Sequence, residues 1–556
     1  MATPTVPASL QVRSSDSAKG RSLHATRAFS PGQTVHAFAA PSLALASTTH
    51  LARVCSHCLR PCDARACSRC RAAFYCGPDC QRAAWAAVHA RECKALRRPR
   101  GADAPSPPAA AARLPTPVRA LVQALLVDGV ERALGSLEGH VPRRRRGPGP
   151  DGADAWRDLR IMATAGCAFA GKEGTENDID KAVELLCKIQ TNAFHRYDAD
   201  LGQVGIFLEP TLAMANHSCV PNAIVQFIGR KAILTAERPI KAGDEIEISY
   251  TDYTYPLVKR QQALAPYCFE CSCPRCKDDL NVYQVCAASP RSLVPHDLSL
   301  VPDAYTRLSS HPAVNDAATQ ALAKALGESA TTSTETRTLT SHDSLRERHE
   351  MLLAQYRDCA GLVAADLWAV TPVPQLLTEI SIYYAEQGEF AFALAVACFI
   401  ATACDAHRYA AYFHPVRAKN VLIIAKLLAH TAEGTAAPSR AVDSINTRAG
   451  PDQRIRETLR DIDQVSLCQM LLTMVLRSAP AGHAHEWDVA APAREMLQDI
   501  GQLPGREKEL SLIMAWMQDP AGEECRAFFD YAVVQQVDAL AGLGRDVLQT
   551  NFGTGA

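Results

Sequence analysis

The chain has 556 residues, of which 47% are hydrophobic and 21% charged, the balance of an ordinary soluble globular protein. This length allows roughly three or four domains of ~150 residues each. The 58 Lys and Arg residues nearly balance the 59 Asp and Glu residues, which gives a formal net charge of −1. Such a balance excludes a protein that binds nucleic acid through bulk charge, and no direct sequence-specific nucleic-acid binding is expected.

Membrane and secretory segments are not expected either. No apolar stretch approaches the ~20 residues that cross a bilayer, and the first residues lack the charged and apolar regions of a secretory signal. The 21 cysteines gather in closely spaced pairs. In a long chain without such a signal, this pattern favours zinc ligands over disulfides. We therefore expect a reducing compartment: the cytoplasm, the nucleus or both.

The first part of the chain combines short strands with a cysteine-rich block. Strands are expected over residues 10–50, where Pro31 and Gly32 mark a turn. A dense Cys/His block follows at 55–93. Residues 97–116 are rich in Pro, Ala and Arg, which is typical of a linker.

Two helices are predicted in the next part of the chain. The first covers about residues 118–134. The second covers about 178–194, because apolar residues recur there at helical spacing and Asn177 or Asp178 can cap its N-terminus.

A loop rich in Arg, Gly and Pro is expected between these helices, at residues 141–152. It contains four consecutive arginines, Arg143 to Arg146. A dense basic run can serve as a nuclear import signal, and a solvated loop is the alternative.

Strand character returns over residues 203–253. Two apolar runs, 223–228 and 231–235, flank Gly229, which predicts a hairpin. Residues 245–250 alternate strictly between apolar and polar side chains, which predicts a half-buried strand.

The chain is predicted to be helical from about residue 346 to 546, after a mixture of linker and loosely packed helix at 280–345. The segment 382–395 has small and aromatic residues at packing positions around a turn at Gly388. It fits one helix–turn–helix unit of the tetratricopeptide type. An irregular helical bundle is the alternative.

Four pairs of metal ligands stand in the Cys/His block, each pair separated by two or three residues. The pairs are Cys55 with Cys58, Cys67 with Cys70, Cys76 with Cys80, and His89 with Cys93. Eight such ligands hold two tetrahedral zinc ions with no position left open for catalysis. Metal binding stabilises a segment too short to build a core of its own. Cys62 is surplus to these pairs.

A further cysteine cluster lies far along the chain, at Cys271, Cys273 and Cys276. Three thiolates packed so tightly need a fourth ligand to close a tetrahedral zinc site. Cys219 is the nearest candidate in a special context, because it closely follows Asn216. The sequence therefore predicts a third zinc that joins two distant parts of the chain.

Four fragments, in this order and with this spacing, resemble the SET-and-MYND (SMYD) family of protein lysine methyltransferases. They are Lys19-Gly20-Arg21-Ser22-Leu23, Asn192-Ala193-Phe194, residues 216–222 together with 243–250, and residues 267–276. The Cys/His block itself resembles the MYND finger at every ligand position. The resemblance is detailed over about residues 10–277 and looser through the helical region, where His414-Pro415 opens a helix.

The resemblance implies an α+β multidomain chain. A β-rich SET domain with a knotted turn is interrupted by a two-zinc MYND finger, and a zinc-binding post-SET segment and an α-helical, tetratricopeptide-like C-terminal domain follow. The expected boundaries are 10–54 for the N-terminal part of the SET domain, 55–93 for the MYND finger, 94–253 for linker, helical insert and SET core, 254–277 for the post-SET segment, 278–345 for a linker and 346–556 for the helical C-terminal domain.

The implied cofactors are S-adenosyl-L-methionine and three zinc ions, two in the finger and one in the post-SET segment. By the resemblance, the finger ligands interleave along the chain. One zinc takes Cys55, Cys58, Cys76 and Cys80, the second takes Cys67, Cys70, His89 and Cys93, and the post-SET zinc takes Cys219, Cys271, Cys273 and Cys276.

The resemblance also implies roles for single residues. Tyr250 is the implied active-site tyrosine. Cofactor contacts are implied for Lys19, Gly20, Arg21, Asn192, Asn216, His217, Tyr250 and Phe269. The walls of the channel that admits the substrate lysine are implied at Phe194, Tyr250 and Tyr267.

Physical chemistry supports this reading. A lysine amine has a pKa near ~10.4 and must lose its proton before it attacks a methyl group. An aromatic channel removes water from the ammonium and lowers that pKa, and aromatic faces hold the cation beforehand.

We therefore expect a protein-lysine N-methyltransferase that acts on histone or non-histone proteins. The alternative is a non-catalytic adaptor, in which the MYND finger and the helical region bind partners. Proline-rich peptides are the partners implied for the finger, near Gln81 and Trp85. Filling of a small core is the alternative role for Trp85.

Overall fold

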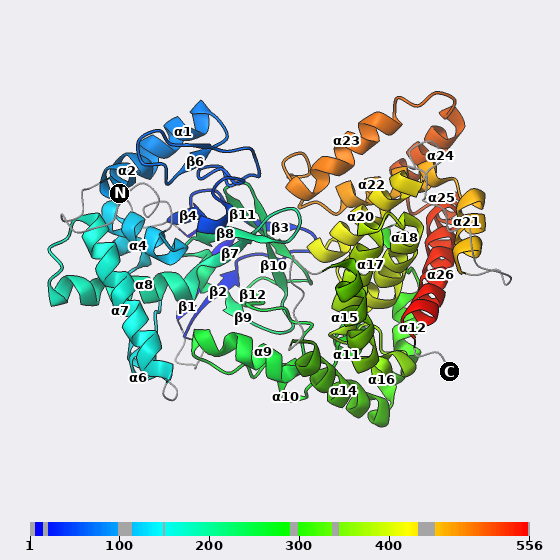
Figure 1. The fold of residues 1–556 in the computed structure, drawn as a ribbon, viewed down its shortest axis with the longest axis horizontal. Helices are drawn as coiled ribbons and strands as arrows, with labels where there is room; N and C mark the ends of the chain where they lie inside the picture. The colour runs from blue at the N-terminus through cyan, green and yellow to red at the C-terminus, as the bar shows by residue number, and fades with distance from the viewer. Residues whose placement is uncertain are drawn as a thin grey trace. The chain divides into compact units, whose positions relative to one another are not determined.

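The computed structural model describes residues 6–14, 20–97, 114–147, 151–289, 298–335, 344–431 and 451–553. Lys19 lies outside these ranges. The chain divides into two compact units, each described here by itself (Figure 1). The first unit comprises residues 1–250 and 263–271, and the second comprises 251–262 and 272–556.

Short strands dominate the first unit, in small sheets rather than one large one. The strands are β1 (Leu10–Ser14), β2 (Arg21–Ala25), β3 (Thr34–Phe38), β4 (Leu43–Ala46), β5 (Arg65–Ala66), β6 (Phe74–Tyr75), β7 (Phe194–Tyr197), β8 (Gln203–Leu208), β9 (Asn216–His217), β10 (Ala223–Ile228), β11 (Lys231–Ala236) and β12 (Glu247–Ile248). The strand orders are β1-β2, β10-β11-β3, β4-β8-β7, β5-β6 and β12-β9. β9 and β12 are parallel, and every other pair is antiparallel.

Segments far apart in the sequence share these sheets. β3 pairs with β11, and β4 pairs with β8. Apolar side chains from these strands meet in one core, in which Leu23, Phe207 and Leu234 have no exposed surface. The segments before and after the Cys/His block therefore fold together as one body.

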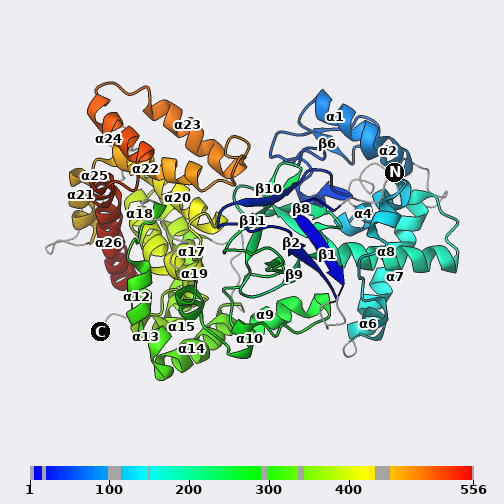
Figure 2. The ribbon, with the colours of Figure 1, turned by 180° about the vertical axis from the view of Figure 1, so that it is seen from behind.

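Helices cover part of this strand body (Figure 2). The bounds are α1 (Pro78–Ala84), α2 (Ala90–Leu96), α4 (Thr116–Leu126), α5 (Val130–Leu134), α6 (Val141–Arg146), α7 (Asp151–Ala170) and α8 (Glu176–Asn192). α4, α7 and α8 pack on one another and form a second apolar core with Leu45 of β4 and Leu208 of β8.

Several sequence expectations for the first unit are confirmed. Strands occupy much of residues 10–50, and the hairpin of β10 and β11 turns at Gly229, whose φ is +53°. That left-handed conformation favours glycine because a side chain there is strained.

The helix expected over 118–134 is instead two helices, α4 and α5. The break falls at Gly129, whose φ of +92° lies outside the helical region. The segment 141–152, expected to be a loop, contains the short helix α6 and the start of α7. The helix α7 was not predicted from the sequence.

Two further expectations need correction. α8 is capped by Thr175, which forms a reciprocal capping box with Asp178, rather than by Asn177 or Asp178. In the stretch 245–250, regular pairing is limited to the two residues of β12, and Glu245 adds a single bridge to His24.

The described residues of the second unit are helical. Its longer helices are α14 (Ala317–Glu335), α15 (Leu345–Asp358), α17 (Val373–Glu386), α18 (Phe390–Phe399), α20 (Pro415–Thr431), α21 (Pro451–Asp461), α22 (Gln464–Arg477), α23 (Ala491–Ile500), α24 (Glu507–Gln518) and α26 (Gln535–Asn551). α18 packs against α17, α20 and α26 and is central to this unit.

The helix–turn–helix expected around Gly388 is present as α17 and α18, and a helix opens at Pro415 as expected. A mixture of linker and helix was expected at 280–345, and its described part is mostly helix, with α11 (Val282–Ala287), α12 (Ala304–Ser310), α13 (Pro312–Asn315) and α14.

The expectation that no stretch is apolar and long enough to cross a membrane also needs correction. The helical run Phe390–Arg408 meets that test by length and composition. Of its most apolar window, 72% is buried inside the protein, as befits the central helix of a packed unit.

Candidate active site and metal centres

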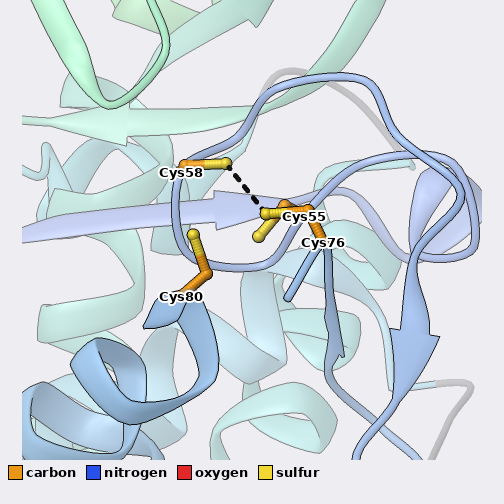
Figure 3. A group of neighbouring side chains, drawn as sticks. All are labelled: Cys55, Cys58, Cys76 and Cys80. Carbon is orange, nitrogen blue, oxygen red and sulfur yellow. Dashed lines mark hydrogen bonds between the residues drawn. The ribbon is translucent and has the colours of Figure 1, made fainter. Parts of the chain in front are cut away.

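Three groups of cysteine and histidine side chains converge in the structure, and within each group the ligand atoms lie within 4.8 Å of one another. The first group is Cys55, Cys58, Cys76 and Cys80. Its sulfurs face a common centre, with Cys80 reaching from the start of α1 (Figure 3). A set of four thiols at this spacing fits a tetrahedral Zn²⁺.

The second group is Cys67, Cys70, His89 and Cys93, and all four are buried. The ring nitrogen Nε2 of His89 lies 3.6 Å from the Cys70 sulfur, so it faces the centre of the group. Its other ring nitrogen, Nδ1, lies 2.8 Å from a carboxylate oxygen of Glu92. A histidine held in this way keeps one nitrogen free for a metal.

Glu92 is itself fixed by partners on α4. Its other oxygen accepts hydrogen bonds from Arg119 and Gln123, each at 2.9 Å. Burial raises the pKa of this carboxyl, but the charge of Arg119 and the hydrogen bond with His89 outweigh burial and lower the pKa to about 2. Glu92 is therefore an anion within a network that ties the metal-binding group to α4.

The third group is Cys219, Cys271, Cys273 and Cys276, the set expected from the sequence. The Cys219 sulfur is buried and lies 4.0 Å from that of Cys271. The interleaved ligand sets of the other two groups also match expectation. These three donor sets fit zinc, because soft thiolate and imidazole ligands in groups of four suit a tetrahedral ion.

Asn216 and His217 form β9, which lies parallel to β12 with Asn216 opposite Glu247 and His217 opposite Ile248. The side-chain amide of Asn216 donates to the Arg21 carbonyl at 3.0 Å and to the Glu245 carboxylate at 2.8 Å. The Asn-His pair is thereby tied to the turn that enters β2.

His217 is fixed from both sides of its ring. Its Nδ1 accepts the backbone N–H of Tyr250 at 3.0 Å, and its Nε2 lies 3.2 Å from the Cys219 sulfur. In the neutral ring, an accepting Nδ1 leaves the hydrogen on Nε2, where it faces the sulfur. One side chain thus links Tyr250 to the third metal-binding group.

Tyr250 is held at both ends. Its hydroxyl donates to the carbonyl of Ala215 at 2.7 Å. Burial raises the pKa of Tyr250, and the nearby Tyr267 and Glu245 raise it further. The phenol is therefore neutral at physiological pH.

Two aromatic rings from the segment after α9 (Leu257–Leu264) complete this cluster. The ring centroid of Tyr267 lies 4.8 Å from that of Tyr250, and that of Phe269 lies 5.9 Å from that of His217. Phe269 is 36% exposed, so part of its ring is available to a ligand. The structure thus brings together Asn216, His217 and these aromatic residues.

Other expected site residues have different surroundings. Asn192, the last residue of α8, donates its amide hydrogens to the carbonyls of Glu138 and Lys188, each at 2.8 Å. Phe194 begins β7 opposite Phe207 and packs on the edge of the strand core.

Glu138, Arg143 and Arg144 contact this region and were missed by sequence reasoning. Arg143 and Arg144 donate to the carbonyls of Cys268 and Pro266, and Glu138 accepts the Asn192 amide through its own carbonyl. Every residue has a backbone carbonyl, so the sequence does not mark which of them are used. Only the density of the arginine run could have drawn attention to them.

A family model of the SET domain matches residues 20–251 of this chain. Among curated proteins, the SET domain and MYND-type zinc finger protein 6 of Schizosaccharomyces pombe is 28% identical over 42% of this chain and 45% of its own length. N-lysine methyltransferase SMYD2-B of Danio rerio is 30% identical over 46% of this chain and 58% of its own.

Histone-lysine N-methyltransferase SMYD3 of Homo sapiens is 31% identical over 40% of this chain and 51% of its own length. The matched region spans about half the length of these relatives. The SET-domain match includes strands β2 to β12, the first two cysteine and histidine groups, Cys219 and the Asn-His pair. Over this part of its length, the chain is similar to the SET domain and to these proteins of the SMYD type.

Proposed function

We propose that this protein is an S-adenosylmethionine-dependent protein-lysine N-methyltransferase. The observation that carries this proposal is the convergence of Asn216, His217 and Tyr250 with the rings of Tyr267 and Phe269. The relatives named as N-lysine and histone-lysine methyltransferases support the same reaction. The substrates are lysine side chains of histones or other proteins.

The residues present fit such a cofactor. Gly20 has a φ of +68° and open space where a side chain would stand, next to the Arg21 carbonyl that Asn216 binds. Phe269 offers a partly exposed ring on which a flat base can stack. We propose that Lys19, Gly20, Arg21, Asn192, Asn216, His217 and Phe269 contact the cofactor.

S-adenosylmethionine supplies, when bound, a sulfonium methyl group that a neutral amine can attack. The protein must therefore position the lysine and favour its neutral form. The rings of Tyr250 and Tyr267, with Phe194 as a further wall, form a dry aromatic channel that lowers the pKa of the ammonium. The Tyr250 hydroxyl gives its hydrogen to Ala215, so its oxygen can accept an N–H of the amine and orient its lone pair.

The three metal-binding groups have distinct proposed roles. Two zinc ions fold the MYND finger, and the third, in the post-SET segment, holds Cys219 beside His217 and so helps to shape the active site. None has a ligand position open for catalysis, because four protein atoms surround each centre.

Tyr250→Phe tests the enzymatic function. Zinc-loaded wild-type protein should transfer labelled methyl groups to lysines in a protein extract, and mass spectrometry should locate them. Loss of the hydroxyl should lower the rate by about 100-fold or more, as removal of one positioned polar group does at other active sites. Tyr531→Phe, at a position 67% exposed, is the matched control.

The adaptor alternative is distinguished by calorimetry. Zinc-loaded protein that binds neither S-adenosylmethionine nor S-adenosylhomocysteine would contradict the enzymatic function and leave a protein that only binds partners.

We further propose that the MYND finger binds proline-rich peptides near Gln81 and Trp85. The Trp85 side chain is 37% exposed, with the Arg69 guanidinium 5.2 Å from its ring, so it is a surface group rather than core filling. Proline-rich segments dock on exposed aromatic faces. Trp85→Ala should remove binding to a proline-rich peptide library while the zinc content stays unchanged.

We propose a location in the cytoplasm, the nucleus or both, because the thiol-rich metal groups need a reducing environment. Fractionation of cells that express the tagged chain tests this location.

A further inference from the structure

Two arginines of the run in α6, Arg143 and Arg144, donate hydrogen bonds to other segments of the protein. The Arg144 guanidinium donates to the Gln190 side chain at 3.3 Å and to the Thr191 hydroxyl at 3.0 Å, both near the end of α8. It also donates to the Pro266 carbonyl at 3.3 Å. One side chain thus joins α6, α8 and the segment that carries Tyr267.

Arg143 makes a second connection to the same segment. Its guanidinium donates to the carbonyl of Cys268. Cys268 has a φ of +62°, a left-handed conformation that is strained for a residue with a side chain. A conformation of this kind persists only where its surroundings hold it, and here an arginine holds the carbonyl of the strained residue.

Residues that directly precede α6 reach other parts of the same site. The Glu138 carbonyl accepts the Asn192 amide at 2.8 Å. The pKa of the Glu138 carboxyl is lowered, chiefly by the hydrogen bond from the His140 backbone, and the charges of His140 and Arg21 contribute. Residues 138–146 thus contact or face three segments that bear expected cofactor contacts.

We propose that Arg143 and Arg144 are positioning residues that fasten the Pro266–Cys268 turn and thereby hold the rings of Tyr267 and Phe269 against Tyr250 and His217. This role rests on the proposed methyltransferase function. The two arginines touch no reacting atom. They act by fixing the carbonyls on both sides of Tyr267, so that the channel wall and the adenine platform keep one arrangement.

The same helix supplies a matched control. Arg145 and Arg146 are exposed, and the Arg146 guanidinium donates to the Pro142 carbonyl of its own helix at 3.3 Å. A double substitution at either pair removes the same charge from the same helix. Any difference between the two double variants therefore comes from the contacts with residues 266–268 and with α8, not from net charge.

The test compares Arg143→Ala/Arg144→Ala with Arg145→Ala/Arg146→Ala in the full-length, zinc-loaded protein. Calorimetry with S-adenosylhomocysteine should give a Kd about tenfold higher for the first variant and unchanged for the second, because a charged hydrogen bond to a carbonyl contributes about that factor. Hydrogen exchange should rise in residues 263–271 of the first variant and not in the helices of the second unit.

Arg144→Lys separates positioning from simple charge. A lysine keeps the charge but lacks the planar fork that reaches α8 and Pro266 together, so it should restore only part of the affinity. In steady-state assays, the KM for the cofactor should rise more than kcat falls, because the reacting groups remain.

Each outcome bears on one of the two proposals. If wild-type protein binds no cofactor, the proposed function fails and this role fails with it. If wild type binds and the Arg143/Arg144 variant equals the Arg145/Arg146 variant in affinity and in exchange, the positioning role is overturned and the function stands. Equal loss in both variants would assign the effect to charge and also overturn it.

Discussion

Glu92 is a fully buried carboxylate, and its partners explain how the protein tolerates it. One carboxylate oxygen of Glu92 is hydrogen-bonded to His89. The other accepts hydrogen bonds from Arg119 and Gln123. A buried charge that is paired and hydrogen-bonded is stable, whereas one that loses a partner is costly. The network also orients the ring of a metal ligand, which makes Glu92 a residue whose loss is felt at the metal.

Glu92→Gln should weaken zinc binding by the Cys67, Cys70, His89 and Cys93 group by about 10–100-fold, the usual effect of removing a carboxylate behind a metal-bound histidine. Competition with a chromogenic chelator measures this affinity: one zinc per chain should leave the variant at a lower chelator concentration than in wild type. Glu131→Gln, at an exposed position of α5, is the control. If Glu92→Gln released this zinc at the same chelator concentration as wild type, the role of Glu92 would be contradicted.

His407 provides a pH-dependent residue in the second unit. Burial lowers its pKa from 6.5 to about 4. Because the folded-state pKa lies below the unfolded value, the unfolded chain binds more protons between these values. Its contribution to stability is present above pH 6.5 and is lost as the pH falls toward 4.

For this one group, the free energy of unfolding should change by at most about 1.4 kcal/mol per pH unit. His407→Gln should remove it, so that the free energy of unfolding of the second unit falls less steeply between pH 6.5 and pH 5. His485→Gln changes an exposed histidine, with 76% of its side chain accessible, and should leave the slope as in wild type. Denaturant titration at several pH values measures both.

At the scale of elements, the close packing of α18 and α26 depends on a glycine. A side-chain carbon built at Gly544 would lie 2.2 Å from the carbonyl oxygen of Ala395. No real carbon approaches a backbone oxygen so closely, so the two helices must separate to admit one. Gly542, two residues earlier on the same helix, has nothing within 4 Å of that position.

Gly544→Ala should therefore destabilise the second unit by about 1–3 kcal/mol through overpacking. Gly542→Ala on the same helix should stabilise it by up to about 1 kcal/mol, because alanine is the better helix former. Thermal melting followed by circular dichroism should show opposite shifts. Equal shifts in the two variants would mean that the contact between α18 and α26 does not limit stability.

The same scale shows where sequence reasoning succeeds and fails. The hairpin at Gly229 and the helices around Gly388 were predictable because local turn chemistry determines them. α7 was not, because its weak apolar pattern becomes meaningful only against α4 and α8. The length of the strand at 245–250 was overestimated. Alternating polar and apolar residues indicate which side chains are buried, but not how many residues pair with a neighbouring strand.

In the candidate site, too, some features could be predicted from the sequence and others could not. Zinc ligands and the Asn216-His217 pair were visible as spaced motifs, and the structure groups the twelve metal ligands as expected. The contacts of Tyr250 with Ala215 and of Arg144 with Pro266 were not visible. Both use backbone carbonyls, which every residue possesses, so tertiary structure alone selects them.

At the scale of the whole molecule, metal content and folding are linked. Each of the three groups supplies four ligands, so elemental analysis of the purified protein should give three zinc ions per chain. Two per chain would mean that the Cys219 group does not close. Binding of metal that requires the folded ligand arrangement contributes directly to folding free energy.

Removal of zinc with a strong chelator should therefore act unevenly. Hydrogen exchange should rise over residues 55–93 and around Cys219, while the helices α17, α18 and α26 keep their protection. Re-addition of zinc should restore both the protection and any methyl transfer. Uniform loss of protection throughout the chain would contradict the local role of the metal groups.

The pairing of β3 with β11 also bears on how the protein is made. The Asn216 amide that binds the Arg21 carbonyl follows it by 195 residues, and β11 lies still further along. At a synthesis rate of ~5–20 residues per second, the first strands leave the ribosome roughly 10–40 s before these partners exist. During that interval the nascent N-terminal strands have open edges, whereas the Cys/His block already carries all eight of its ligands. The N-terminal strands therefore pair only after this interval, whereas the Cys/His block can bind metal before it ends.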